Sequence, residues 1–600
     1  MSEFWIHPSL ILLVGALLLR LVPAGLKKTW LMLVPAAAFA RVLMLTPGTF
    51  GEVPFLEWTL TFGRVDKLSL VFGYIMALTC TINTLYGLQV KEDAQHIAAW
   101  TYAAGSLGAI FAGDYLTLFL FWELMAFSSV FLVWFRREPA SLAAGFRYLL
   151  VHTAGGLSLL AGIILLGVGG PGLAFNAFDV HHPTVASWLV LGGFLLNAAV
   201  PPLHAWLPDA YSRGTWNGSV FLSAFTTKTA VYALCRGFAG FEILVVLGVV
   251  MTLYGVVYAV IENDMRKLFG YHIISQVGYM VAGVGIGTDL AINGACAHAF
   301  AHILYKGLLF MGGGAVLHMA GRTKFTELGG LYQKMPWTFV FTLVGGLSIS
   351  GFPLLSGFVS KSMIVQAGFD HHLLWAGFLL NLAAIGTFYC NGLKVPYLVW
   401  FGKNNCAPET WERAKDPPWN MMAAMAIASG LCLFIGCYTP YLYDMLPRPG
   451  LEYHPFTAYH VSESLELLLF TALAFFLLVR FGKVVPHATI SIDLDWFYRK
   501  LGRGIYWLAT KPVQAVDNLV GELYRLLGLI PLMFTARTAG RVDNGIIDSA
   551  VDGLAHSVAG LGQRLRTAQR GQLQQGLALT VAAVVLVAAL LYWLLQRGGA

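Results

Sequence analysis

One apolar segment of this sequence, residues 293–318, carries three ionisable side chains at a regular spacing. His298, His302 and Lys306 follow one another at intervals of four residues, which on an α-helix places them along one side in steps of about 6 Å. Ionisable groups inside a membrane segment are costly and usually line a water-filled path or pair with one another. Two imidazoles and a desolvated amine titrate near neutral pH, so this row would pass a proton. The alternative is packing, with a histidine bound to a backbone carbonyl and the lysine extended to the surface.

Further charged residues lie inside other apolar segments. Glu123 stands near the middle of YLTLFLFWELMAFSSVFLVWF, and Lys228 lies within VFLSAFTTKTAVYAL. An isolated lysine at the centre of a bilayer costs roughly 2.5 kcal/mol or more, so several at comparable depth indicate a hydrophilic axis through a helix bundle. Lys394 is nearer to an interface and has the alternative role of a membrane anchor. The additional candidates for the axis are Glu123, Lys228, Lys361 and Lys394, with His152 and His204 beside them.

The composition is that of a membrane protein. Of the 600 residues, 57% are hydrophobic and 12% are charged, about half the charged fraction of a soluble domain. We therefore predict an all-α polytopic membrane protein. The net charge of +7 gives no sign of nucleic-acid binding, because the basic residues lie in short loops and in the C-terminal segment. The seven cysteines show neither a CxxC pair nor a metal spacing, and no nucleotide-binding loop occurs, so we expect no metal site, no cofactor and no enzyme activity of the chain's own.

Apolar runs of spanning length recur from end to end and predict about sixteen helices. The predicted spans are 5–22, 29–46, 67–90, 95–113, 115–135, 143–168, 185–211, 217–238, 241–261, 270–287, 290–317, 335–369, 372–401, 419–438, 463–481 and 574–596. Loops rich in Lys and Arg follow the odd-numbered spans. By the positive-inside rule we expect an N-terminus outside and basic loops in the cytoplasm, in the inner (cell) membrane. The first span is expected to be retained, because it lacks the basic region and cleavage site of a signal peptide.

Two of these spans contain helix-breaking residues. The seventh holds Pro201 and Pro202, and the twelfth holds Pro353; proline inside a helix removes a backbone hydrogen bond and clashes with the preceding turn. Interruptions at corresponding positions of two halves are typical of an inverted repeat with transport sites at the breaks. Five spans separate the two breaks, so the repeat units would be spans 4–8 and 9–13, in opposite orientations. The alternative is a pair of unrelated proline kinks.

The C-terminal part differs from the rest. Residues 485–573 are less apolar and place apolar residues at helical spacing among charges, which is typical of interfacial amphipathic helices. A last apolar span follows. We expect the amphipathic segment to hold a partner, and the alternative is a cap on the membrane surface without one. The predicted division of the chain is 1–90 for helices 1–3, 91–238 and 239–402 for the two repeats, 403–484 for helices 14–15, 485–573 for the amphipathic region and 574–600 for a terminal anchor.

Several of these motifs, taken in order, resemble one family of membrane subunits. The matching pieces are FWE with Glu123, PLHAWLPDAY at 202–211, TKTAVYAL with Lys228, DMRKLFGYHIISQVGYM at 264–280, HAFAHILYKGLLFMGGGAVLH at 298–318 and GFPLLSGFVSK at 351–361. They resemble the antiporter-like subunits of respiratory complex I, membrane-bound hydrogenases and Mrp-type cation/proton antiporters, in particular the D-type antiporter component of Mrp complexes and the distal membrane subunit of complex I. The resemblance covers roughly residues 60–400.

This resemblance implies a fourteen-helix core with two inverted five-helix repeats that contain broken helices. It also implies proton translocation along a lysine-rich axis, and the residues carried over are Glu123, Lys228, His298, His302, Lys306 and Lys361. The C-terminal layout looks like the lateral helix and terminal anchor of complex I's distal membrane subunit. Partners would then be other membrane subunits of a hetero-oligomeric complex, held by that helix, with the lipid bilayer around them and protons, or alternatively Na⁺, as the transported ion.

One position departs from the family pattern. Asn197 stands where the family usually has a lysine that pairs with the glutamate of the fifth span. Asparagine holds a water molecule in a path but carries no charge, so Glu123 lacks its usual partner. Either Lys228 takes that role, or the first half-channel works differently. Gly156 also stands where the largest such subunit of complex I tends to have an aspartate.

The predicted function is that of a proton-translocating subunit in a multi-subunit cation/proton antiporter or complex I-like complex. Two alternatives stay open. One is a subunit that energises inorganic-carbon uptake, and the other is a structural subunit that has lost transport, which Asn197 favours.

Overall fold

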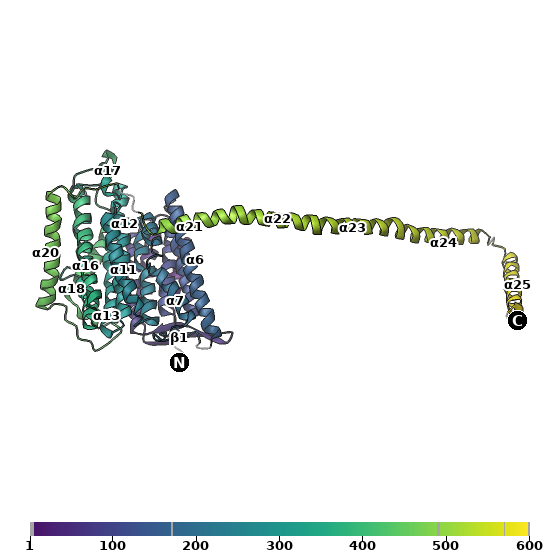
Figure 1. The fold of residues 1–600 in the computed structure, drawn as a ribbon, viewed down its shortest axis with the longest axis horizontal. Coiled ribbons are helices and arrows are strands. Elements are labelled where there is room, and N and C mark those ends of the chain that lie inside the picture. Colours follow the sequence, from purple (N-terminus) through teal and green to yellow (C-terminus); the bar gives the residue numbers. More distant parts are fainter. Residues whose placement is uncertain (1–4, 170–171, 489–491, 569–570, 598–600) are drawn as a thin grey trace. The chain divides into compact units, whose positions relative to one another are not determined.

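A computed structural model of the chain describes residues 5–169, 172–488, 492–568 and 571–597 (Figure 1). Parts of the predicted segments that fall on 1–4, 170–171, 489–491, 569–570 and 598–600 lie outside the described residues. The chain divides into two compact units, residues 1–496 and 497–600.

The first unit is a bundle of helices, several of which are interrupted. Ten helices of the described residues, two of them in the second unit, are long and apolar enough to cross a membrane, which confirms the predicted all-α membrane class. The longer helices of this unit are α1 (Pro8–Leu18), α2 (Lys27–Leu43), α3 (Lys67–Tyr86), α4 (Asp93–Phe111), α5 (Tyr115–Trp134), α6 (Pro139–Val168), α7 (Val185–Asn197), α8 (Trp206–Arg213), α9 (Gly218–Ala224), α10 (Thr226–Gly237), α11 (Ile243–Ile261), α12 (Met265–Ile286), α13 (Asp289–Ala320), α14 (Pro336–Ser350), α15 (Ser356–Asp370), α16 (Leu374–Phe388), α18 (Trp419–Cys437) and α20 (Ala458–Arg480).

Three of the predicted spans are each divided into two helices. Pro201 and Pro202 lie in the non-helical stretch between α7 and α8, and Pro353 lies between α14 and α15. The division between α9 and α10 at Phe225 was not predicted, because no proline or glycine marks it. After α16 the chain continues as wide π-helical turns at Tyr389–Lys394 and Tyr397–Phe401. Each interruption leaves the last carbonyl groups of a helix without their usual amide partners.

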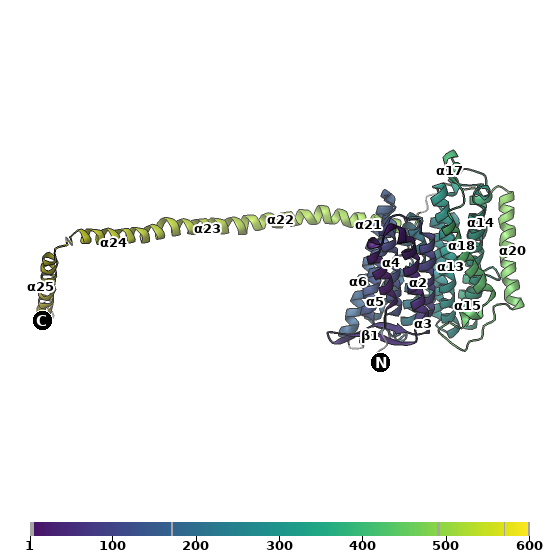
Figure 2. The ribbon, with the colours of Figure 1, turned by 180° about the vertical axis from the view of Figure 1, so that it is seen from behind.

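A β-hairpin, which the sequence analysis did not predict, packs against one end of the bundle. Strand β1 (Gly48–Phe55) pairs antiparallel with β2 (Trp58–Val65), with Gly48 opposite Val65. The side chain of Asp114 accepts a hydrogen bond from the amide of Thr61 at 2.7 Å, and Arg64 donates to the carbonyl of Phe175. Figure 2 shows β1 at the same end of the bundle as the N-terminus. Side-chain anchors to distant loops therefore hold the hairpin in place.

Two loop contacts recur at equal spacing in the chain. Asp114 forms an isolated antiparallel bridge with Ala174, and Asp264 forms one with Lys324, each position 150 residues after its counterpart. Asp114 caps the start of α5, and Asp264 caps the start of α12, through hydrogen bonds to backbone amides. In both halves the capped helix is followed by a long helix and then by a broken one. This correspondence supports the proposal that residues 91–238 and 239–402 are repeats.

Helix α13 lies at the centre of the bundle and is almost completely buried. It contacts α12, α14, α15, α18, α9 and α3. Neighbouring helices α11 and α12 pack closely because glycines recur every seven residues on each of them. These glycines are Gly248 and Gly255 on α11, and Gly278 and Gly285 on α12. Small residues let membrane helices approach one another until their backbones touch.

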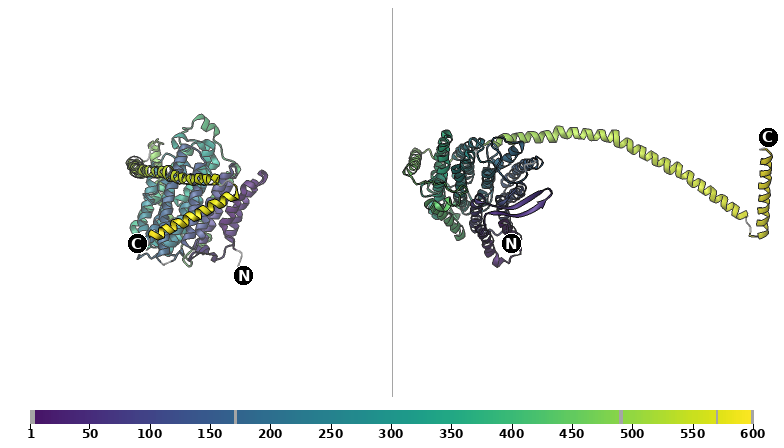
Figure 3. Two further views of the ribbon diagram at one scale, coloured as in Figure 1. Left: turned by 90° about the vertical axis from the view of Figure 1, so that its right-hand side faces the viewer. Right: turned by 90° about the horizontal axis from the view of Figure 1, so that it is seen from below.

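The second unit is a long, exposed helical rod followed by a separate helix. The rod comprises α21 (Asp495–Leu508), α22 (Gln514–Tyr524), α23 (Ile530–Val542) and α24 (Asp548–Ala568), joined by single π-helical stretches at Ala509–Val513, Arg525–Leu529 and Asp543–Ile547. Its 73 residues from Asp495 to Thr567 correspond to about 110 Å. Figure 3 shows the rod as one gently bent helix. Helix α25 (Leu573–Arg597) follows.

The glycine contact between α11 and α12 gives a stability prediction. A Cβ atom at Gly278 would lie 2.4 Å from the Thr252 hydroxyl oxygen and 2.6 Å from the Gly248 carbonyl oxygen. We expect Gly278→Ala to force the helices apart and to cost about 1–3 kcal/mol, which would lower the thermal unfolding temperature of the purified protein. Gly430→Ala is the control, because a Cβ atom there meets nothing within 4 Å. Equal unfolding temperatures for both variants would contradict the prediction.

Candidate functional site: a buried row of ionisable residues

The three ionisable residues of α13 are fully buried. His298, His302 and Lys306 each have 0% of their surface exposed. The ring centroids of the two histidines are 6.3 Å apart. Nδ1 of His298 lies 3.0 Å from the Ser360 hydroxyl on α15, and its Nε2 lies 3.3 Å from the Tyr305 hydroxyl. The row on α13 is thus connected to α15, the second half of a broken helix.

Two of the buried lysines donate to carbonyl groups that helix breaks leave free. Nζ of Lys228 lies 2.6 Å from the carbonyl oxygen of Ser223, in the last turn of α9. Nζ of Lys361 lies 3.0 Å from that of Ile349, in the last turn of α14. A helix C-terminus carries partial negative charge, so it suits an ammonium group. Each of these interruptions therefore provides the binding partner of an amine.

The other two lysines differ in their surroundings. Lys394 donates to the carbonyl oxygens of Val260 and Glu262 at the end of α11, at 2.7 and 2.8 Å. Its amine thus binds protein carbonyls, whereas a membrane anchor would bind lipid headgroups. Lys306 donates to the carbonyl of Phe269 at 3.3 Å and lies over the ring of that residue.

Glu123 has no cationic partner among the described residues. Its Oε1 atom is buried and unpaired, and the carboxylate lies against Gly156 of α6, where a Cβ atom would come within 2.0 Å of it. The proposed pairing with Lys228 is not formed, since that amine binds Ser223. Absence of a side chain at Gly156 is therefore what makes room for the carboxylate.

Two further polar side chains lie on the same side of α6 and at the end of α7. The ring of His152, one turn before Gly156, packs between Tyr148 and Trp206, with centroids 4.1 and 4.5 Å away. Asn197 is the last residue of α7 and faces His152. Both ring nitrogens of His152 and both amide atoms of Asn197 are buried without a protein partner among the described residues. These groups and Glu123 form one polar region in the first half of the chain.

The spacing of 150 residues between the two loop bridges also relates the polar residues of α6 and α13. His152 corresponds to His302, and Gly156 corresponds to Lys306. Both histidines are buried, and neither ring nitrogen of either one is paired within the described part of the chain. The first half therefore has the histidine but has glycine in place of the amine.

His204 does not join the interior row. It lies in the stretch between α7 and α8, and its Nε2 atom lies 3.0 Å from a carboxylate oxygen of Asp493. Asp493 was not among the predicted site residues, because no sequence pattern connects two residues so far apart.

Sequence analysis also missed His272, Gln276 and Tyr305. His272 lies on α12, is fully buried, has two ring nitrogens unpaired among the described residues, and experiences the charges of Lys306, Lys361 and Lys394. Tyr305 points its hydroxyl to both Gln276, at 3.5 Å, and His298. The signal for His272 was present, since a histidine inside the predicted span 270–287 is as costly as those on α13.

Many of these groups have polar atoms that no described protein group satisfies. Buried polar atoms without a protein partner are usually hydrogen-bonded to internal water. The side chains of the region with at least one such atom are Trp122, Glu123, His152, Asn197, His204, Thr227, His272 and His302.

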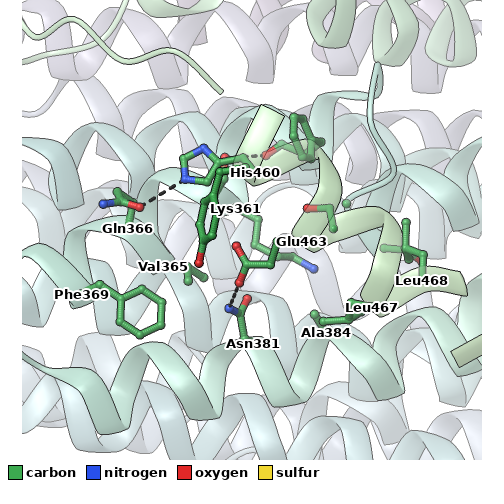
Figure 4. Close-up of a pocket in the computed structure, with 16 residues that line it drawn as sticks. Lys361, Val365, Gln366, Phe369, Asn381, Ala384, His460, Glu463, Leu467 and Leu468 are labelled. Atoms are coloured by element: carbon green, nitrogen blue, oxygen red, sulfur yellow. Dashed lines mark hydrogen bonds between the residues drawn. The ribbon is translucent and has the colours of Figure 1, made fainter. Parts of the chain in front are cut away.

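Lys361 is an interior amine that reaches a cavity. It is 6% exposed, whereas Lys228 and Lys306 are 0% exposed. A cavity of about 280 Å³ lies between α15, α16 and α20 and includes Lys361 in its wall (Figure 4). Figure 4 also shows Glu463 hydrogen-bonded to Asn381, and His460 to Gln366. At about 30 Å³ per water molecule the volume holds several waters.

The bundle and its buried row define a membrane protein of a recognisable class. The family described as NADH:quinone oxidoreductase/Mrp antiporter, transmembrane region, matches residues 112–386. The uncharacterized protein MJ1309 of Methanocaldococcus jannaschii is 30% identical over 411 residues, which cover 65% of this chain and 84% of that protein. The chain belongs to this family.

Two other relatives have named roles. Hydrogenase-4 component B of Escherichia coli is 28% identical over 63% of this chain and 62% of its own length. Na(+)/H(+) antiporter subunit A1 of Staphylococcus haemolyticus is 26% identical over 74% of this chain and 62% of its own length. The chain spans less than two thirds of the length of these two proteins.

Solved structures share the fold. A chain of the membrane-bound sulfane sulfur reductase, an archaeal respiratory membrane complex, aligns with a TM-score of 0.69 at 24% identity, over 88% of this chain and 99% of that chain. A chain of the Mrp complex from Dietzia sp. aligns with a TM-score of 0.65 at 21% identity, over 78% of this chain and 98% of that chain.

The contact between Gly156 and Glu123 is testable. Gly156→Ala places a methyl group where the carboxylate oxygen lies, so the carboxylate must move. We expect proton flux through vesicles that contain the assembled complex to fall about tenfold to a hundredfold, the factor typical of a reacting group misplaced by about 1 Å. Gly155→Ala is the control on the same helix, because its methyl group would meet Leu196. Equal flux in the two variants would argue against a role for the Glu123 position.

Proposed function

We propose that this chain is the proton-translocating subunit of a multi-subunit cation/proton antiporter or complex I-like membrane complex. The observation that carries the proposal is the buried row of amines and imidazoles, His298, His302 and Lys306 with Lys228 and Lys361, in a member of this family. Buried ionisable groups at membrane depth mark ion pathways and proton relays. The coupling ion is a proton, with Na⁺ as the exchanged cation in an antiporter.

In the proposed route, protons pass between the two halves of the chain along the interior. Glu123 and His152 would serve the first half, and His298, His302 and Lys306 the second. Lys228 would connect them, since the helix that carries it, α10, contacts α13. A proton on one amine raises the cost of a proton on its neighbour, so charge movement at one group drives movement at the next.

The cavity beside Lys361 would connect this route to one side of the membrane. With the N-terminus outside, as the positive-inside rule predicts, the end of α15 and the start of α20 lie at the outer surface. Lys361 would then release its proton outward through the cavity. Lys394, whose amine binds carbonyl groups at the end of α11, would lie on the cytoplasmic side of the same half.

The proposal includes partner subunits, which the rod of the second unit would contact. Large apolar side chains are exposed along its rod, among them Leu519, Leu523, Leu527 and Leu554. These exposed apolar side chains would lie on neighbouring membrane subunits and lipid. The chain would act as a transporter subunit, and any redox reaction would belong to other subunits of the complex.

Lys306 and Lys361 give the decisive test of transport. Lys306→Ala and Lys361→Ala remove an amine from the row, and we expect each to reduce proton flux of the assembled complex in vesicles to background. The amount of protein in the membrane should stay the same, because deleting a buried charge relieves a desolvation cost. Lys91→Ala, in an exposed loop, is the control.

Unchanged flux in both variants would remove the translocation proposal and leave the structural-subunit alternative. The inorganic-carbon alternative is distinguished by the chains that co-purify with the native complex.

A further inference from the structure

A short segment just before the rod is buried in the first unit. The carboxylate of Asp493 is 7% exposed and is bound by side chains from three different elements. Its Oδ1 atom accepts from Nε2 of His204 at 3.0 Å and from the hydroxyl of Tyr254 on α11, and its Oδ2 atom accepts from the hydroxyl of Tyr271 on α12 at 2.7 Å. The preceding carbonyl, of Ile492, accepts from Tyr258 at 3.0 Å.

This arrangement defines the charge of Asp493. Burial favours the neutral acid, but the hydrogen bond from His204, the charge of that ring when it is protonated, and the two tyrosine hydroxyls outweigh burial and lower the pKa of Asp493 to about 2. The carboxylate is therefore ionised at neutral pH, and an ionised carboxylate only accepts hydrogen bonds. Other charged groups on this side are Lys267 and Glu262, which pair with each other at 2.9 Å beside Tyr271, and Asp495, two residues further along the chain.

The charge of Asp493 in turn determines which nitrogen of His204 carries the proton. Because Nε2 must donate to the carboxylate, the neutral ring has its lone pair on Nδ1. That Nδ1 atom is fully buried and has no partner among the described residues. The ring belongs to the break between α7 and α8, which is also next to Asn197 and to Trp206, the neighbour of His152.

We propose that Asp493 is a positioning residue that turns His204 into a proton-accepting site at the break of the first half. The proton is taken up at Nδ1, the ring becomes an imidazolium while Nε2 keeps its bond to Asp493, and the same Nδ1–H bond breaks when the proton moves on. Asp493 remains ionised throughout and balances the positive ring. This inference rests on the proposed function, since it assigns residues to the same proton route.

The test measures proton flux against pH in vesicles that contain the assembled complex. Asp493→Asn removes the counter-charge of the protonated ring and the carboxylate that fixes which nitrogen of His204 carries the proton. We expect flux at neutral pH to fall about tenfold. Asp493→Glu should restore most of the flux. Tyr271→Phe is the matched control, because it removes one hydrogen bond and keeps the carboxylate and the imidazole.

A second measurement does not depend on transport. The ¹⁵N spectrum of histidine-labelled protein, minus that of His204→Gln, isolates the signals of His204. In the neutral ring of the wild type we expect a protonated Nε2 and an unprotonated Nδ1, and we expect Asp493→Asn to lose this preference. A protonated Nδ1 in the neutral wild-type ring would overturn the proposal.

Equal flux profiles for Asp493→Asn and the wild type would also overturn the proposal. Equal losses in Asp493→Asn and Tyr271→Phe would overturn it too, because they would show that the contact has only a structural role. Failure of the proposed function looks different, because Lys306→Ala would then keep full flux in the same vesicles.

Discussion

Backbone carbonyls at helix interruptions are the binding partners on which this interior depends. A bilayer offers no water to a broken helix or to a buried ammonium group, and each alone would be costly. Here the two bind each other. The ammonium group of Lys228 donates to a carbonyl at the end of α9, and that of Lys361 donates to a carbonyl at the end of α14. Each of these two helix breaks therefore supplies a carbonyl acceptor to one buried amine.

Helices α6 and α13, one in each half of the chain, carry different side chains beside a buried histidine. On α13 the histidine at 302 is followed one turn later by Lys306, whereas on α6 His152 is followed by Gly156, against which Glu123 packs. Asn197 lacks a charge as well. Residues 91–238 thus combine the carboxylate of Glu123 with imidazoles and the amine of Lys228, whereas residues 239–402 combine imidazoles with the amines of Lys306, Lys361 and Lys394.

The segment that precedes the rod is connected to this interior through the buried carboxylate of Asp493 and the carbonyl of Ile492. Asp493 lies two residues before α21 and is bound by His204, Tyr254 and Tyr271. Such a contact costs desolvation and is stable only because both oxygens of the carboxylate accept hydrogen bonds. The rod that follows exposes large apolar side chains such as Leu519, Leu527 and Leu554.

Hydropathy and proline positions were enough to predict the all-α membrane class and two of the helix interruptions. The segments predicted at 185–211 and 335–369 are each two helices in the structure, with the predicted prolines between them. These features are local, so a single sequence displays them. The hairpin at 48–65 and the division at Phe225 were missed, because distant side chains and packing hold them rather than local signals. The burial of His298, His302 and Lys306 followed from their spacing, but their partners did not. Which carbonyl receives each lysine, why Glu123 faces Gly156, and how His204 meets a residue 289 positions away were decided by the tertiary structure, since contacts between distant residues leave no periodicity in the chain.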